Sequence, residues 1–228
     1  SNVISILPMA HMYGMSFEFI YEFLSGVHIY YLTRIPSPAI ISQALQEVKP
    51  IIMIAVPLVI EKIIRKKVFP KIQNKMRLLL NMPVINKKVR AKIREQVYQA
   101  FGGNLYEIII GGAALNREIE NFLRMIEFPY TVGYGATECG PIICYRDWHT
   151  FAKGSCGQAA LHQEVRIDSP DPANVAGEIL TKGPNVLLGY YKNEEDTART
   201  IDKEGWFHTG DLGLMDEDGN VFIKGRSK

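Results

Sequence analysis

The sequence predicts a mixed α/β sheet layer, followed by a small antiparallel, barrel-like β subdomain. Strand and helix patterns alternate up to about residue 145, which is typical of an α/β layer fold. Short strands separated by turn residues follow, with one short helix among them, and this pattern favours antiparallel pairing. We therefore expect one subdomain over residues 1–145 and a second over residues 146–228.

The first predicted helix follows a loop and has apolar side chains at steps of four from Met15 to Phe23. Glu18 and Glu22 share its polar face, which we expect to be solvated. The helix ends at Gly26, and "VHIYYL" then predicts a strand.

The next elements carry clear boundary signals. In "SPAIISQALQEV", Ser37 is expected to cap a helix that has Pro38 at its first position. "PIIMIAVP" is a continuous apolar run, which indicates a buried, parallel strand. Helices are expected over 58–67 and 86–101, the second with an apolar stripe and a stop at Gly102-Gly103.

The remaining elements alternate more rapidly. "NLYEIIIGGAAL" predicts a strand that runs into a glycine-bearing loop, "NREIENFLRMIE" a helix capped by Asn116, and "PYTVGYG" another strand and loop. Beyond residue 145 the expected strands are "EVRIDSP", "GEILTKG", "NVLLGYY" and "NVFIKGR", and the expected helix is "NEEDTART".

The composition is that of a globular protein with one or two domains. The 228 residues are 47% hydrophobic, and no segment reaches the roughly 18 to 20 apolar residues of a membrane span. The first residues lack the basic region of a signal peptide. The three cysteines lack paired spacing such as C-x-x-C, so we expect the reducing cytoplasm rather than a disulfide framework.

Charge is unevenly distributed, although the net charge is only +2. Residues 61–95 contain 12 Lys and Arg but only two acidic residues, so the rest of the chain carries 14 basic and 22 acidic residues. Such a block can attract phosphates, nucleic acid or anionic lipid, or it can be a solvated helical face. Because the block has only one aromatic residue, Phe69, nucleic acid is not the expected partner.

The stretch "YTVGYGATECGP" combines backbone freedom with polar chemistry. Gly133 and Gly135 flank Tyr134, whose ring can stack on a purine when the backbone approaches closely. Thr137 offers a hydroxyl to a phosphate, and Glu138 offers a hard oxygen ligand to magnesium. The alternative interpretation is a tight turn with a surface tyrosine.

Other segments add candidates of lower specificity. "IIIGGAAL" places Gly112, Ala113 and Ala114 after a strand, at the sheet edge where open α/β proteins bind ligands. In "GWFHTGDLG", Asp211 suits a ribose diol, and the alternative is a turn aspartate. Arg226 in "GRSK" suits a ribose or phosphate. His11 lies in the small-residue loop "LPMAHMYG", and a structural role is the alternative. Neither glycine loop matches the G-x-x-x-x-G-K-[ST] phosphate loop.

Taken together and in this order, these segments resemble the adenylate-forming superfamily of acyl-CoA synthetases, adenylation domains and luciferases. The matching pieces span residues 5–228: "LPMAHMYG", "GGAAL", "GYGATECGP", "GEILTKGPNVLLGYY", "GWFHTGDLG" and "GRSK". The connecting text, including "IIMIAVPLVIEKI", resembles long-chain fatty-acid–CoA ligases. The resemblance implies part of the large domain of an acyl-CoA synthetase.

The resemblance also implies a reaction: a carboxylate and ATP give an acyl-adenylate and pyrophosphate, and coenzyme A then gives the thioester and AMP. It implies that Glu138 binds Mg²⁺, Thr137 contacts phosphate and His11 lines the acyl site. For the nucleotide, it implies contacts from the segments around Gly112 and Tyr134 and from Asp211 and Arg226. Lys228 matches the hinge to a C-terminal domain.

Two features of the resembled family lie outside the match, namely a Ser/Thr/Gly-rich phosphate loop and a catalytic lysine beyond the hinge. We therefore expect the 228-residue chain alone to have little ligase activity. Alternatives are a ligase for aryl or short-chain acids or for acyl carrier protein, and a non-catalytic nucleotide-binding pseudo-enzyme. Since long-chain acids partition into membranes, the basic block over 61–95 is expected to permit peripheral contact with anionic lipid; coenzyme A phosphates are a competing target.

Overall fold

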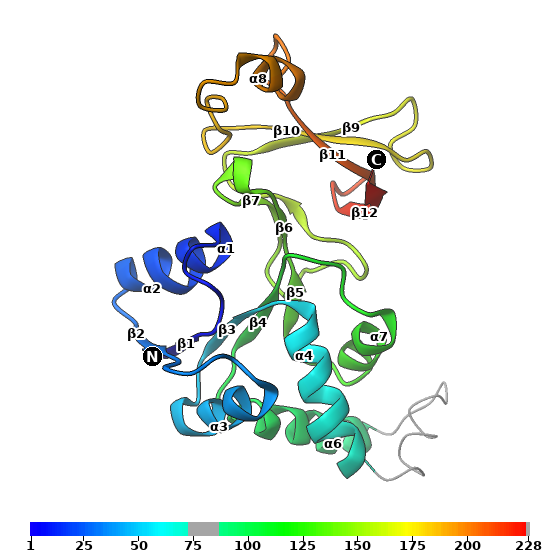
Figure 1. Ribbon diagram of the computed structural model, residues 1–228. Helices are drawn as coiled ribbons and strands as arrows, with labels where there is room; N and C mark the ends of the chain where they lie inside the picture. The colour runs from blue at the N-terminus through cyan, green and yellow to red at the C-terminus, as the bar shows by residue number, and fades with distance from the viewer. Residues whose placement is uncertain (73–86, 227–228) are drawn as a thin grey trace. The chain divides into compact units, whose positions relative to one another are not determined.

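The computed structural model describes residues 1–72 and 87–226 and confirms the mixed α/β class, with one parallel sheet and two antiparallel sheets (Figure 1). The chain forms two compact units, Ser1–Tyr130 and Thr131–Lys228. The subdomain boundary expected at 145/146 stays a prediction.

The first unit is organised around a five-stranded sheet of order β2-β1-β3-β4-β5. The bounds are Asn2–Ser5 for β1, His28–Tyr31 for β2, Ile52–Ala55 for β3, Glu107–Ile110 for β4 and Tyr130–Val132 for β5. Strand β1 is parallel to both β2 and β3, and β3 is parallel to β4. The apolar run predicted as a buried parallel strand is β3, the middle strand of the sheet.

Helices confirm most of the boundary signals. The bounds are Pro38–Val48 for α3, Pro57–Ile63 for α4, Lys87–Ala100 for α6 and Arg117–Met125 for α7, and a π-helical turn η2, Ile64–Val68, extends α4. The Ser37 hydroxyl accepts a hydrogen bond from the Ile40 N–H, as an N-cap should. Helix α3 contacts both α4 and α6 (Figure 1), so the apolar faces of these helices share one core.

The helix predicted over 15–26 forms, but its orientation differs from the prediction. It consists of α1, Met12–Gly14, a π-helical turn η1, Met15–Ile20, and α2, Tyr21–Leu24. Glu18 and Glu22 are buried, whereas Phe23 and Leu24 are 67% and 78% exposed. The expectation of a solvated carboxylate face was therefore wrong. Periodicity identifies the two faces of a helix, but it does not determine which face is buried when backbone donors need a carboxylate.

The second unit contains a four-stranded sheet of order β12-β11-β10-β9 and a three-stranded sheet of order β6-β7-β8. The first sheet comprises β9, Glu164–Asp168, β10, Gly177–Lys182, β11, Phe207–Met215, and β12, Val221–Arg226. The second comprises β6, Tyr134–Gly135, β7, Ile142–Tyr145, and β8, Gln158–Ala159. All registered pairs in both sheets are antiparallel, as the spacing of turn residues predicts.

The segment "NVLLGYY" is not the strand that its apolar residues predict. It forms successive turns, and Tyr190 makes an isolated bridge to Asn193. Leu188 is fully exposed, whereas the adjacent Val186 and Leu187 pack against the core of the second unit, so the apolar side chains do not alternate between two faces as in a strand. Helix α8, Glu194–Thr200, follows it and is capped by the Asn193 side chain, as predicted.

Within the described ranges, we find no helix with the length and apolar character needed to span a bilayer.

Candidate nucleotide-binding site

Two of the predicted loops leave the sheet of the first unit at the same edge. The loop bearing His11 follows β1, and the glycine loop follows β4, so both begin at the carboxyl ends of parallel strands. Tyr13 connects them: its hydroxyl donates to the Ile109 carbonyl over 3.1 Å. A Cβ added to Gly111 would lie only 2.9 Å from the Tyr13 ring, so Gly111 permits this contact. Both residues lie in quoted motifs, "LPMAHMYG" and "GGAAL", but the contact between them was not predicted.

The candidate residues of these loops are accessible. His11 is exposed, and its Nδ1 accepts a hydrogen bond from the Tyr13 N–H, so it caps α1 and, when neutral, carries its proton on Nε2. Gly112 has a φ of +83°, a conformation that favours glycine. Gly112, Ala113 and Ala114 are all exposed. Their contact with a nucleotide and the contact of His11 with the acyl group stay predictions.

Glu18 supports the start of the His11 loop from inside the first unit. Its carboxylate accepts hydrogen bonds from the Ser5 hydroxyl over 2.9 Å and from the N–H groups of Ile6 and Leu7 over 2.9–3.1 Å. Burial, with a smaller contribution from the neighbouring Glu22, raises the pKa of Glu18 to about 7, and these hydrogen bonds only partly oppose the shift.

In the second unit, three predicted site residues from separate motifs form one connected group. The Tyr134 hydroxyl donates to Asp211 Oδ2 over 2.7 Å, and Arg226 Nε lies 3.0 Å from Asp211 Oδ1. Asp211 and Arg226 face each other across β11 and β12. Since each carboxylate oxygen has more than one acceptor direction, Asp211 can still accept from a ribose hydroxyl.

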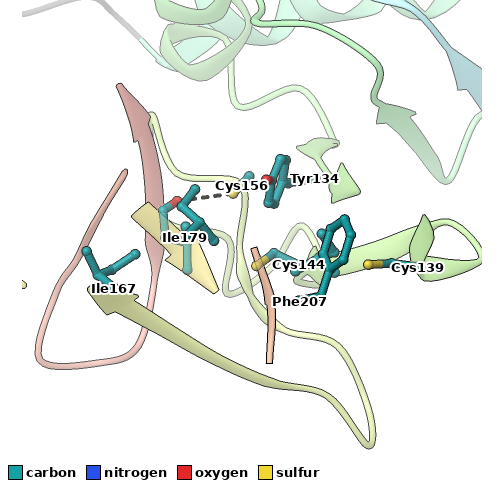
Figure 2. Packing of buried hydrophobic residues seen from close by; sticks show 9 residues of the cluster. Tyr134, Cys139, Cys144, Cys156, Ile167, Ile179 and Phe207 are labelled. Atoms are coloured by element: carbon teal, nitrogen blue, oxygen red, sulfur yellow. Dashed lines mark hydrogen bonds between the residues drawn. The ribbon is translucent and has the colours of Figure 1, made fainter. Parts of the chain in front are cut away.

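Tyr134 is more buried than a tyrosine in a surface turn would be. It is 8% exposed and belongs to a buried cluster with the cysteines, Ile179 and Phe207 (Figure 2). Burial and the hydrogen bond to Asp211 raise the pKa of Tyr134, so its phenol remains a donor. The interpretation as a surface tyrosine is therefore wrong, whereas adenine stacking on Tyr134 stays a prediction.

The three cysteines are free thiols packed in this cluster. Burial, aided by the negative charge of Glu138, raises the pKa of Cys139 to about 12, so its thiol is not ionised near neutral pH. Cys156 donates to the Val221 carbonyl, the dashed contact in Figure 2. The small, apolar character of the cysteines serves packing.

The two glycines around Tyr134 differ in their surroundings. A Cβ at Gly135 would overlap the backbone carbonyl of Pro141, so the pairing of β6 with β7 itself requires glycine there. A Cβ at Gly133 would have its closest neighbour at 3.5 Å, an ordinary contact. Folding therefore explains Gly135, and close approach of a ligand stays a prediction for Gly133.

Thr137 and Glu138 begin a short 3-10 turn, Thr137–Cys139, directly after β6. Thr137 is exposed and Glu138 is half-buried. Glu138 Oε1 accepts a hydrogen bond of 3.0 Å from the Tyr190 hydroxyl, and the Glu138 carbonyl accepts one of 2.8 Å from the Leu187 N–H. The segment 185–191 therefore supports the turn through both the side chain and the backbone of Glu138.

Asn185 is a further residue that sequence reasoning missed. Its side-chain amide donates to the carbonyls of Ile142, over 2.8 Å, and Cys139, and it accepts from the Gln163 amide. It thus attaches "GPNVLLGYY" to the last residue of the turn that carries Glu138 and to the first residue of β7. That motif was part of the resemblance, so its place in the motif order pointed to this segment. Its side-chain contacts could not be predicted from the sequence.

The carboxylate oxygens of Glu138 are donor atoms of the kind that binds Mg²⁺. Throughout residues 1–72 and 87–226, no group of three His, Cys, Asp or Glu side chains could hold a metal ion. Mg²⁺ is commonly bound by one or two carboxylates together with substrate phosphates and water, so a single glutamate is compatible with it. Lys228, the predicted hinge, lies outside the described residues.

A glycine-bearing loop at the carboxyl end of a parallel strand, in an α/β fold with small antiparallel sheets, is typical of nucleotide-binding α/β proteins. More specifically, the chain belongs to the family of AMP-binding enzymes, whose family model matches residues 1–191. This match confirms the adenylate-forming superfamily that the motifs indicated.

Two curated relatives illustrate the similarity. Rice (Oryza sativa subsp. japonica) 4-coumarate–CoA ligase 2 is 40% identical over 134 residues, which cover 53% of this chain and 23% of the relative. The 4-coumarate–CoA ligase of Pinus taeda is 36% identical over 162 residues, which cover 64% of this chain and 30% of the relative. The match thus spans less than a third of either relative's length.

Solved structures show the same fold at lower identity. O-succinylbenzoate coenzyme A synthetase (MenE) from Bacillus subtilis, in complex with ATP and magnesium ion, has a TM-score of 0.73 at 21% identity and covers 100% of this chain and 42% of its own. ATP-bound MatB from Rhodopseudomonas palustris has a TM-score of 0.74 at 23% identity, and the match covers 100% of this chain and 40% of MatB.

Proposed function

We propose that this chain forms the adenylate-binding part of an ATP-dependent, AMP-forming acid–CoA ligase. The observation that carries the proposal is the connected group of Tyr134, Asp211 and Arg226, in a member of the AMP-binding family. Thr137 and Glu138 follow Tyr134 along the chain, so these residues would supply contacts for the base, ribose, phosphate and metal, and the loop of Gly112, Ala113 and Ala114 is proposed to add contacts to the base.

The reaction joins two anions, the acid and ATP, and the thiol of coenzyme A then displaces AMP. A carboxylate oxygen of the acid bonds to the α-phosphorus of ATP as the bond to pyrophosphate breaks. The coenzyme A sulfur then bonds to the acyl carbon as AMP leaves, and the thiol proton is released. Bound Mg²⁺ would neutralise phosphate charge. Glu138 would hold it, Thr137 would bind phosphate, and Asp211 and Arg226 would orient the ribose.

For the acid, we propose a long-chain fatty acid, on the resemblance of the connecting segments. An aryl acid is the second candidate, because the relatives described above are 4-coumarate–CoA ligases. In either case, His11 would line the acyl site near the reacting carboxylate.

A peripheral contact with anionic membranes is proposed through the basic block of residues 61–95. Part of this charge is balanced within the first unit, because Arg65 lies 2.8 Å from Glu118, and Arg90 and Arg94 lie 3.8 and 3.3 Å from Glu127. The contact is therefore expected to be weak. Cosedimentation with vesicles that does not depend on anionic lipid content would contradict it.

The test is acid-dependent ATP–pyrophosphate exchange by the longer protein that contains this chain, over fatty acids of graded length and 4-coumarate. We expect exchange with one class of acid and a loss of roughly 100-fold in Glu138→Ala, since the magnesium ligand is removed. Glu164→Ala is the control, because Glu164 is exposed on β9. Exchange that Glu138→Ala leaves unchanged would contradict the metal role, and nucleotide binding without exchange would favour the pseudo-enzyme.

A further inference from the structure

The contact between Tyr190 and Glu138 assigns a function to a residue that the motifs left without one. We propose that Tyr190 is a positioning residue that orients the Glu138 carboxylate for the magnesium–nucleotide complex. The inference rests on the proposed function, because it requires Glu138 to bind the metal. Its direct basis is the 3.0 Å hydrogen bond from the Tyr190 hydroxyl to Glu138 Oε1.

Tyr190 is itself held by its neighbours. Its N–H donates to the Thr197 hydroxyl over 2.9 Å, and Thr197 donates in turn to the Asn193 carbonyl over 2.7 Å. Tyr190 also pairs with Asn193 in an isolated bridge, and Asn193 caps α8. The backbone of Tyr190 is therefore fixed to the first residues of α8, so α8 and its cap determine where the phenol lies.

The backbone on the other side of the contact is fixed as well. The Leu187 N–H donates to the Glu138 carbonyl, and Asn185 donates to the carbonyls of Cys139 and Ile142. The segment that carries Tyr190 and the turn that carries Glu138 are thus joined at several points. A shift of one relative to the other would break these hydrogen bonds together.

This arrangement suits a metal-binding carboxylate. A free glutamate side chain loses rotational freedom when it binds a ligand, and a donor that already holds one oxygen reduces that loss. A hydrogen bond to a charged acceptor is also stronger than one between neutral groups.

The test compares Tyr190→Phe with Tyr191→Phe in the longer protein that contains this chain. Each variant removes one hydroxyl, but Tyr191 is 89% exposed. The readout is the Mg²⁺ concentration that gives half-maximal ATP–pyrophosphate exchange. We expect Tyr190→Phe to raise it roughly tenfold, the effect of losing one hydrogen bond to a charged group. Tyr191→Phe should leave it within about twofold.

The Glu138→Gln background separates the role of Tyr190 from the role of Glu138 as the metal ligand. If Tyr190 acts through Glu138, Tyr190→Phe has no further effect on the Mg²⁺ dependence in that background. An unchanged Mg²⁺ dependence in Tyr190→Phe, with Glu138→Gln impaired, would overturn the role of Tyr190 alone. If Glu138→Gln exchanges as the unmodified protein does, the proposed metal ligand fails and the role of Tyr190 falls with it.

Discussion

Glu18 in the first unit and Glu138 in the second are both held by hydrogen bonds, but they differ in what holds them. Glu18 is fully buried, and backbone N–H groups and a hydroxyl surround its carboxylate. Glu138 is half-buried, and a phenol holds one of its oxygens, next to the exposed Thr137. A carboxylate enclosed by backbone donors serves the fold, whereas one oriented at a partly open turn suits a ligand.

The largest effect on folding is expected where the enclosed carboxylate is removed. Glu18→Ala leaves the Ser5 hydroxyl and the N–H groups of Ile6 and Leu7 without their acceptor, and we expect a loss of roughly 4 kcal/mol in the free energy of unfolding. Urea denaturation measures it. Glu47→Ala, at an exposed position on α3, is the control and should cost less than about 0.5 kcal/mol. Equal losses in the two variants would contradict a structural role for Glu18.

The pH dependence of stability provides a second, slightly smaller effect. Burial raises the pKa of Glu18 from 4.5 to about 7. Between these values the folded state binds more protons than the unfolded state, so the free energy of unfolding should fall as pH rises. The full fall is roughly 3 kcal/mol for this group, and Glu18→Gln should remove it. A Glu18→Gln protein with the same pH slope as the unmodified protein would show that another group titrates.

In the second unit, the two glycines around Tyr134 separate folding from ligand approach. Gly135→Ala forces a Cβ against the Pro141 carbonyl, so we expect a loss of roughly 2 kcal/mol in stability from overpacking. Gly133→Ala introduces only ordinary contacts and should change stability by less than about 1 kcal/mol. Thermal unfolding monitored by circular dichroism would compare them, and a Gly133→Ala protein as unstable as Gly135→Ala would contradict the assignment.

The smallest effect is expected at Arg226. The Arg226 side chain is 71% exposed, so its ion pair with Asp211 adds little to stability. If Arg226 contacts the ribose or phosphate, Arg226→Gln should weaken AMP binding roughly threefold in calorimetry, at the level of one exposed charge pair. Arg199→Gln, on the exposed face of α8, is the control, and an equal loss there would indicate a general charge effect.

The sequence predicted the type of most elements because caps and apolar runs act locally. Ser37 and Asn116 cap the helices they were expected to cap, and "PIIMIAVP" forms a buried parallel strand. The orientation of the helix over 12–24 was not predictable in this way. It depends on backbone donors of Ile6 and Leu7, which lie 11 to 12 residues from Glu18 and carry no side-chain signal.

The candidate site was predictable as a set of residues, but not as a set of contacts. Motif order placed Tyr134, Asp211 and Arg226 in one site, and the structure joins them by hydrogen bond and ion pair. Tyr190 was missed because "NVLLGYY" has the composition of a strand, whereas its turns depend on Asn185 and Thr197. Such side-chain contacts between distant segments leave no periodic pattern in the sequence.

We infer that the segment from Gly133 to Cys139 and the first half of β11 bind a nucleotide. Hydrogen–deuterium exchange with mass spectrometry, with and without saturating ATP and Mg²⁺, tests it most directly. We expect slower exchange in peptides covering 133–139 and 207–213, and unchanged exchange in α3, because ligand binding suppresses local opening. Saturated binding that leaves both peptides unchanged would contradict the account.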